Sequence, residues 1–113
     1  MHLEKYRMFK VDANNEANSV PTRIEAYFHA AFHLIEANAA MSGIHIEKHQ
    51  KTRTILETNR QIFNDDTEKV WRAFQEIDNQ IRPGQIYGAA INGKKLKRTI
   101  ELFQSIEIIC GET

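Results

Sequence analysis

Hydrophobic residues recur along the chain at intervals of three and four positions, which is the spacing of one face of an α-helix. Two prolines and five glycines punctuate this pattern, and no segment alternates with the period of two that is typical of a half-buried strand. The pattern therefore predicts an all-α protein. Four substantial helices with short connections favour an up-and-down antiparallel four-helix bundle, with a short additional helix at the N-terminus.

The first two predicted helices cover residues 2–12 and 20–42. Pro21 falls in the first turn of the second helix, where its missing N–H has no helical partner to lose. Gly43 stands just past the end of the same helix, where glycine readily adopts the left-handed conformation that closes a helix. These two residues mark both limits of the second helix.

Three further helices are predicted in the second half of the chain. One covers residues 47–63, and the next covers 67–81 and ends before Pro83, because a proline disfavours helical backbone at the residue before it. Asn92 can cap the last helix, since an asparagine side chain accepts a hydrogen bond from the backbone of the first turn.

One apolar stripe on each predicted helix marks the side that should be buried. The expected inward-facing residues are Leu3, Tyr6 and Phe9 in the first helix, Ile24, Tyr27, Phe28, Ala31, Leu34 and Ile35 in the second, Thr52, Ile55, Leu56, Asn59, Ile62 and Phe63 in the third, Val70, Trp71, Phe74, Ile77 and Ile81 in the fourth, and Leu96, Ile100, Phe103, Ser105, Ile106 and Ile109 in the last. Together these stripes predict one core, so residues 1–113 are expected to form a single domain.

The back of the second helix carries small and weakly charged residues, namely Ala26, Ala30, His33 and Ala37. Small side chains let another helix approach closely, so this face is a candidate contact surface between two subunits. The pattern is thus consistent with a homodimer.

Composition narrows the classes of function. The chain has 15 basic and 15 acidic residues, so it has no long-range field that would attract nucleic acid, and any such binding must be local. Its apolar runs are short and interrupted by charge, which predicts neither a membrane span nor a leader segment. A single cysteine, Cys110, can form no internal disulfide, in agreement with a reducing compartment. We expect a soluble, cytoplasmic protein that does not act at a membrane.

Two pairs of histidines are four residues apart, His29 with His33 and His45 with His49. Within a helix, this spacing places both rings on one face, as zinc-binding helices require. His45 precedes the predicted helix over residues 47–63, so it is interpreted as a loop or capping residue. Ala30 follows His29, however, so the glutamate of the metalloprotease pattern is missing. We therefore expect a polar or subunit-facing strip and no bound metal or cofactor, with His29 and His33 as the remaining candidates for a metal.

Basic residues gather at the start of the last predicted helix, where Lys94 and Lys95 add positive charge to the positive end of the helix dipole. A phosphate at that position would meet both free backbone N–H groups and ammonium groups. In the preceding loop, Arg82 can contribute a guanidinium fork, and Tyr87 can stack on a base. The alternative is that this run of lysines is an ordinary solvated face.

Three segments together resemble the HEPN superfamily of small helical bundles. The run Phe28–His33 is similar to that family's aromatic, aromatic, Ala, Ala, Phe, His core, and the segment Gly43–His49 resembles the start of its third helix. Arg82, followed by Tyr87 and by a helix that Asn92 could cap, is similar to the family's arginine, loop, tyrosine and last helix.

The resemblance covers about residues 21–109 and implies a function. Catalytic members of the superfamily are metal-independent ribonucleases with an arginine followed after four to six residues by a histidine. Tyr87, Gly88 and Ala89 occupy those places after Arg82, so the histidine is missing. The resemblance thus implies a non-catalytic module for nucleotide or RNA phosphate, often homodimeric, that accompanies a small nucleotidyltransferase in a toxin–antitoxin type of system.

Two other interpretations remain open from the sequence. The chain could be a metal-independent ribonuclease in which a histidine outside the motif, such as His49, reaches Arg82 across the bundle or the dimer. It could also be a purely structural interaction protein that dimerises through the alanine-rich back of the second helix.

Overall fold

The computed structural model describes residues 2–83 and 89–111, and these residues form helices and no strand. This confirms the predicted all-α class. The α-helices are α1 (His2–Asn14), α2 (Val20–Met41), α3 (Thr52–Thr58), α4 (Thr67–Gln75) and α5 (Ala89–Cys110). A π-helical segment, η4 (Glu76–Ile81), continues α4 without a break.

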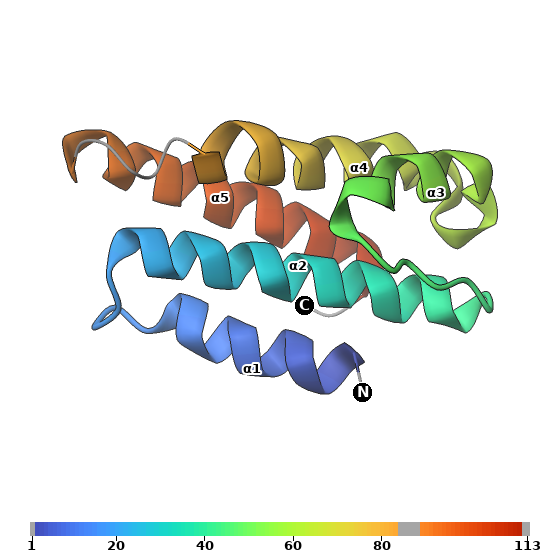
Figure 1. Ribbon diagram of the computed structural model, residues 1–113, viewed down its shortest axis with the longest axis horizontal. Coiled ribbons are helices and arrows are strands. Elements are labelled where there is room, and N and C mark those ends of the chain that lie inside the picture. Colours follow the sequence, from blue (N-terminus) through green and yellow to red (C-terminus); the bar gives the residue numbers. More distant parts are fainter. Residues whose placement is uncertain (1, 84–88, 112–113) are drawn as a thin grey trace.

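The long helices run along the longest axis of the molecule and alternate in direction along the chain (Figure 1). α1 packs along α2, α2 packs on α5, and α5 packs on α4 and η4. α3 lies at one end, over α4. None of the described helices is long and apolar enough to cross a membrane.

Local sequence explains the limits of α2, which agree with the prediction. Ser19 precedes the helix in an extended conformation, and its hydroxyl accepts a hydrogen bond from the backbone N–H of Thr22 at 3.3 Å. Pro21 lies in the first turn. At the other end, Gly43 has a φ of +72°, in the left-handed region that favours glycine, and its N–H donates to the carbonyl of Ala40.

The predicted third helix over residues 47–63 is wrong. Only α3 within that range is α-helical, and it is flanked by the 3-10 turns η1 (His49–Lys51) and η2 (Arg60–Ile62). The helix stops because the Asn59 side chain donates a hydrogen bond to the carbonyl of Ile55 at 2.8 Å and its own backbone leaves the helical region. Asparagine side chains compete in this way with the helical hydrogen-bond ladder.

The last helix also differs from the prediction, since α5 begins at Ala89 and Asn92 lies inside its first turn rather than at its cap. Lys94 and Lys95 therefore fall in the second turn, beyond the N–H groups that lack a helical partner. Alanines are the strongest helix formers, which explains why the helix extends back to Ala89.

The inward stripes predicted for α2 and for α4 with η4 are confirmed, because every residue named for them is buried. On α5 the prediction fails for Ser105, which is exposed, while Leu102 and Glu107 are buried instead. The buried stripe of α5 is thus rotated toward residues that an apolar pattern alone would not select.

The back of α2 is covered by α1 within the same chain (Figure 1). Ala30 is fully buried and Ala26 is 6% exposed. Phe9 of α1 stacks on the rings of His29 and His33, with centroid distances of 4.9 and 5.6 Å. This corrects the interpretation of Ala26, Ala30 and His33 as a subunit contact, because α1 of the same chain packs against this part of α2. For Ala37, which is half-buried, the interpretation stays a prediction.

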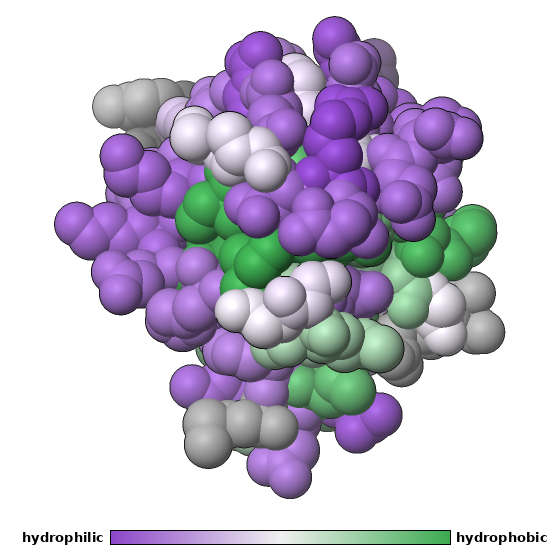
Figure 2. Space-filling model, turned by 90° about the vertical axis from the view of Figure 1, so that its right-hand side faces the viewer, coloured by the Kyte–Doolittle hydropathy of each residue, from purple (hydrophilic) through white to green (hydrophobic). Residues whose placement is uncertain are grey.

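The outer surface is mostly polar. Figure 2 shows the end of the molecule at which α2 finishes, where polar side chains cover most of the view and apolar groups are visible between them. Met41, in the last turn of α2, is 87% exposed.

A buried carboxylate ties α1 to α5. Glu107 is 3% exposed, and its Oε2 accepts hydrogen bonds from the hydroxyl of Tyr6 and, at 2.6 Å, from the ammonium of Lys10. Burying a carboxylate is costly unless it is paired and hydrogen-bonded, and here both conditions are met. The docking of α1 therefore depends on these two donors.

We predict that Tyr6→Phe lowers the free energy of unfolding by about 2 kcal/mol, because it removes a hydrogen bond to a buried charged group. Tyr27→Phe is the matched control, since its hydroxyl donates to the neutral amide oxygen of Asn14 and its loss should cost about 1 kcal/mol. Urea unfolding of both variants tests this, and an equal or smaller effect at Tyr6 would contradict the assigned role of Glu107.

Candidate functional site

Arg82 follows η4 and points toward α2, where its guanidinium contacts two carboxylates. Nε donates to both oxygens of Glu25 at 3.0 and 3.1 Å, and Nη1 donates to Oδ1 of Asp78 at 2.5 Å. The guanidinium carbon lies 3.7 Å from the centroid of the Phe28 ring. A planar, weakly hydrated guanidinium suits such a half-buried position over an aromatic face.

Asp78 joins this guanidinium to a histidine. Its second oxygen, Oδ2, lies 2.9 Å from Nδ1 of His49. The His49 ring stands perpendicular to Phe28, with the two centroids 5.1 Å apart. Phe28 thus contacts both the guanidinium, which lies over its face, and the perpendicular imidazole. We call Arg82, Asp78, His49 and Glu25 the Arg82 centre.

The elements around the centre explain how these side chains meet. Asp78 lies in η4 and Arg82 directly follows it. Because they are four residues apart, their side chains lie on the same face of this segment. Turns of π-helix inside α-helices are found often at functional sites. Glu25 and Phe28 are three residues apart on α2, and the turn η1 brings His49 against the same face.

The arrangement has the chemistry of an oriented acid–base group. The Asp78 carboxylate accepts a hydrogen from Nδ1 of His49, which leaves Nε2 of the ring as the acceptor. The side chain of His49 is 32% exposed, whereas that of Asp78 is only 11% exposed. Asp78 therefore orients the imidazole of His49, and part of the ring is accessible to solvent.

Glu25 is the more exposed of the two carboxylates that contact Arg82. Its side chain is 46% exposed, against 11% for the side chain of Asp78. Two carboxylates on one guanidinium give the centre an excess of negative charge. A phosphate that displaces Glu25 leaves at least as much negative charge at the centre, but it can form a two-bonded contact with the guanidinium, whereas Glu25 contacts only Nε.

A pocket of about 120 Å³ adjoins the centre, lined in part by His49 and Asp78. Arg53 and Trp71 line it as well, and the Arg53 guanidinium lies 4.0 Å from the Trp71 ring centroid. A volume of this size holds a few water molecules or one small anionic group.

The other residues predicted for phosphate binding are placed differently. Tyr87 lies outside the described residues. Lys94 and Lys95 lie in the second turn of α5, and Arg98 of the same basic run pairs with Glu76 of η4 at 2.7 and 3.0 Å. Sequence reasoning therefore selected Arg82 but missed its partners Glu25 and Asp78. The four-residue spacing of Asp78 and Arg82 was a signal for one of them, while nothing in the sequence links Glu25 to Arg82.

The predicted pair His29 and His33 does not act as a pair. His29 Nε2 lies 3.8 Å from Glu25, whereas His33 Nδ1 lies 2.9 Å from Glu36, a different carboxylate. Burial is the main cause that lowers the pKa of His29, and it lowers the pKa of His33 to about 4. Burial also raises the pKa of the Glu36 carboxyl.

Comparisons with known proteins identify no relative of this chain. The chain matches no protein-family model, and searches among curated proteins and among solved structures gave no match.

We predict that His49 carries its proton on Nδ1 when neutral, because Asp78 accepts it there. Long-range ¹H–¹⁵N correlation spectra at pH 8 report the tautomer. Asp78→Ala should abolish the preference for Nδ1–H. Glu25→Ala should keep it, because Glu25 contacts Arg82 and not His49. A wild-type ring protonated on Nε2 would show that Asp78 does not orient it.

Proposed function

We propose that this protein is a HEPN-type module that binds phosphate groups of RNA or of a nucleotide at the Arg82 centre. The observation that carries the proposal is the shared carboxylate: the guanidinium of Arg82 and the half-buried imidazole of His49 both contact Asp78. Nε of the guanidinium donates to Glu25, whose side chain is 46% exposed. The alternating directions of α1, α2, α4 with η4, and α5 support an up-and-down four-helix bundle, with α1 in the place expected for the helix over residues 47–63.

Each residue has a defined part in this proposal. Arg82 binds two oxygens of the phosphate in place of Glu25. Lys94 and Lys95 attract neighbouring phosphates without reading sequence, and Tyr87 stacks on a base. The resemblance further implies a homodimer and a nucleotidyltransferase as the protein partner.

We predict that ATP or a short RNA binds and that Arg82→Lys weakens binding about tenfold, since lysine keeps the charge and loses the guanidinium fork. Fluorescence titrations at two salt concentrations measure this. Lys95→Ala should weaken binding less and reduce its salt dependence.

Arg98→Lys is the matched control, because Arg98 is also an arginine paired with a glutamate but lies outside the centre. It should leave the affinity unchanged. If neither ligand binds, the phosphate-binding function is excluded and the interpretation as a structural protein is left.

A specific observation also favours a second candidate function, a metal-independent ribonuclease. The missing motif histidine has a counterpart in His49, because the carboxylate of Asp78 contacts both His49 and Arg82. Nε2 of His49 can take the proton of a ribose 2′-hydroxyl, whose oxygen then forms a bond to the adjacent phosphorus while the bond to the leaving 5′-oxygen breaks. The leaving oxygen takes its proton from the imidazolium or from water, and Arg82 stabilises the charge on the phosphoryl oxygens.

We predict for this candidate that structured RNA is cleaved in the presence of a chelator and that His49→Ala lowers the rate about 10²- to 10⁴-fold. His45→Ala, which removes an exposed histidine, serves as the control and should leave the rate unchanged. Binding of RNA without cleavage by the wild type would reject the ribonuclease and retain the binding module.

A further inference from the structure

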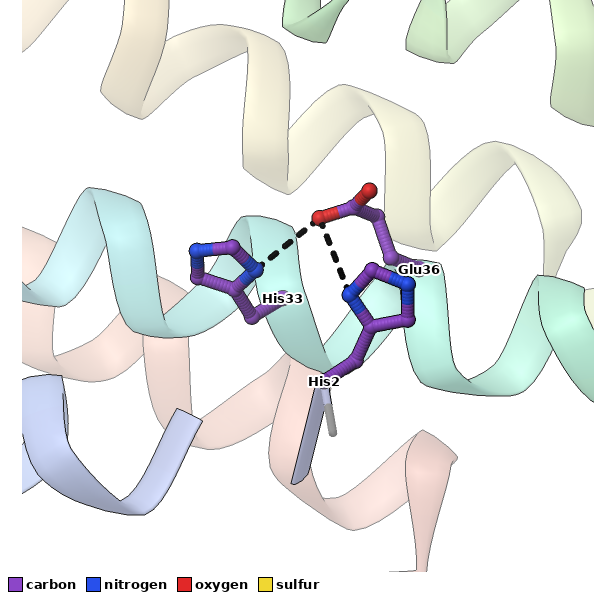
Figure 3. A group of neighbouring side chains, drawn as sticks. All are labelled: His2, His33 and Glu36. Atoms are coloured by element: carbon purple, nitrogen blue, oxygen red, sulfur yellow. Dashed lines mark ion pairs between the residues drawn. The ribbon is translucent and has the colours of Figure 1, made fainter. Parts of the chain in front are cut away.

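Three side chains from two helices meet where the start of α1 lies against α2. His2 comes from the first turn of α1, and His33 and Glu36 come from α2 (Figure 3). Oε1 of Glu36 lies 2.9 Å from Nδ1 of His33 and 3.6 Å from Nδ1 of His2. All three donor atoms lie within 4.8 Å of one another. None of these residues belongs to the Arg82 centre.

These three atoms are buried, yet none has a hydrogen-bond partner among the described residues. Glu36 itself is 6% exposed. Buried polar atoms without partners are rare in native proteins, and each one calls for an explanation such as a water or an ion. Here they converge, since one carboxylate oxygen faces two ring nitrogens (Figure 3).

The spacing of the donor atoms agrees with a shared metal ion. Zinc binds imidazole nitrogen and carboxylate oxygen at 2.0–2.2 Å, so two ligand atoms in a tetrahedral site stand about 3.3 Å apart. The distances of 2.9 and 3.6 Å lie on either side of this value. The rings of His2 and His33 are stacked at 5.9 Å with an angle of 22° between their planes, so both present Nδ1 from one side of the carboxylate.

The donor set selects the class of metal. Two imidazole nitrogens and one carboxylate oxygen suit zinc and neighbouring transition metals, whereas calcium and magnesium require oxygen ligands. Three protein ligands also leave a fourth position open for water or another molecule. Lys5 is the nearby cation whose charge opposes a bound ion.

We propose that His2, His33 and Glu36 form a binding site for a divalent transition metal ion of the zinc class. The ion links the start of α1 to α2 and coordinates all three buried ligand atoms. This site is independent of the proposed phosphate-binding and ribonuclease functions, because it shares no residue with the Arg82 centre.

The test uses the full chain without a polyhistidine tag, freed of metal by a chelator. Zinc is titrated against a chromophoric chelator at pH 7.5, and cobalt is titrated as a spectroscopic probe. One ion per chain is expected, with the intense visible absorption bands of tetrahedral cobalt. His2→Ala, His33→Ala and Glu36→Gln should each lower the zinc affinity by more than about 100-fold, since even the loss of a group that only orients a ligand costs 10- to 100-fold.

His29→Ala is the matched control, because His29 lies one turn before His33 on α2 and stacks on Phe9 as His33 does. It should leave the zinc affinity unchanged. Circular dichroism spectra verify that each variant is folded, and His2→Ala alone decides the case if the α2 variants do not fold. Absence of one-to-one binding by the wild type, or unchanged affinity in His2→Ala, would overturn the proposal.

Discussion

The buried ring of Phe28 is the constraint on which the candidate site depends. It is 1% exposed and stacks on Phe74 of α4 at 5.2 Å, so it belongs to the core. The guanidinium of Arg82 lies over its face, and the imidazole of His49 packs perpendicular to it. The chemistry-bearing groups are therefore positioned by the same packing that stabilises the fold.

Carboxylates at helix–helix contacts give the rest of the arrangement its specificity. Glu107 is satisfied by two donors from α1, and Asp78 is satisfied by Arg82 and His49. Glu36 differs, because its buried oxygen faces ring nitrogens without forming a hydrogen bond. The contrast between two satisfied carboxylates and one unsatisfied carboxylate is the reason that a metal ion is assigned to the third and not to the others.

The first helix has a larger role than its short apolar stripe indicates. It provides Tyr6 and Lys10 to Glu107 and places His2 beside Glu36. It also covers Ala30, which would otherwise leave an apolar face of α2 open. This weakly amphipathic helix is thus held by polar contacts as well as by the buried side chains of Tyr6 and Ala13.

The sequence by itself determined the helical class, the limits of α2 and the buried stripes of α2 and α4, because capping and helical periodicity depend on neighbouring residues. It did not determine that α3 ends before Asn59, where a side chain competes with the backbone hydrogen bonds. It also did not determine that α1 packs over Ala30. Only the tertiary structure decided that Arg82 meets Glu25, 57 positions away, and that His2 meets Glu36. Such meetings depend on the rotation and register of whole helices, which packing sets and local pattern does not encode.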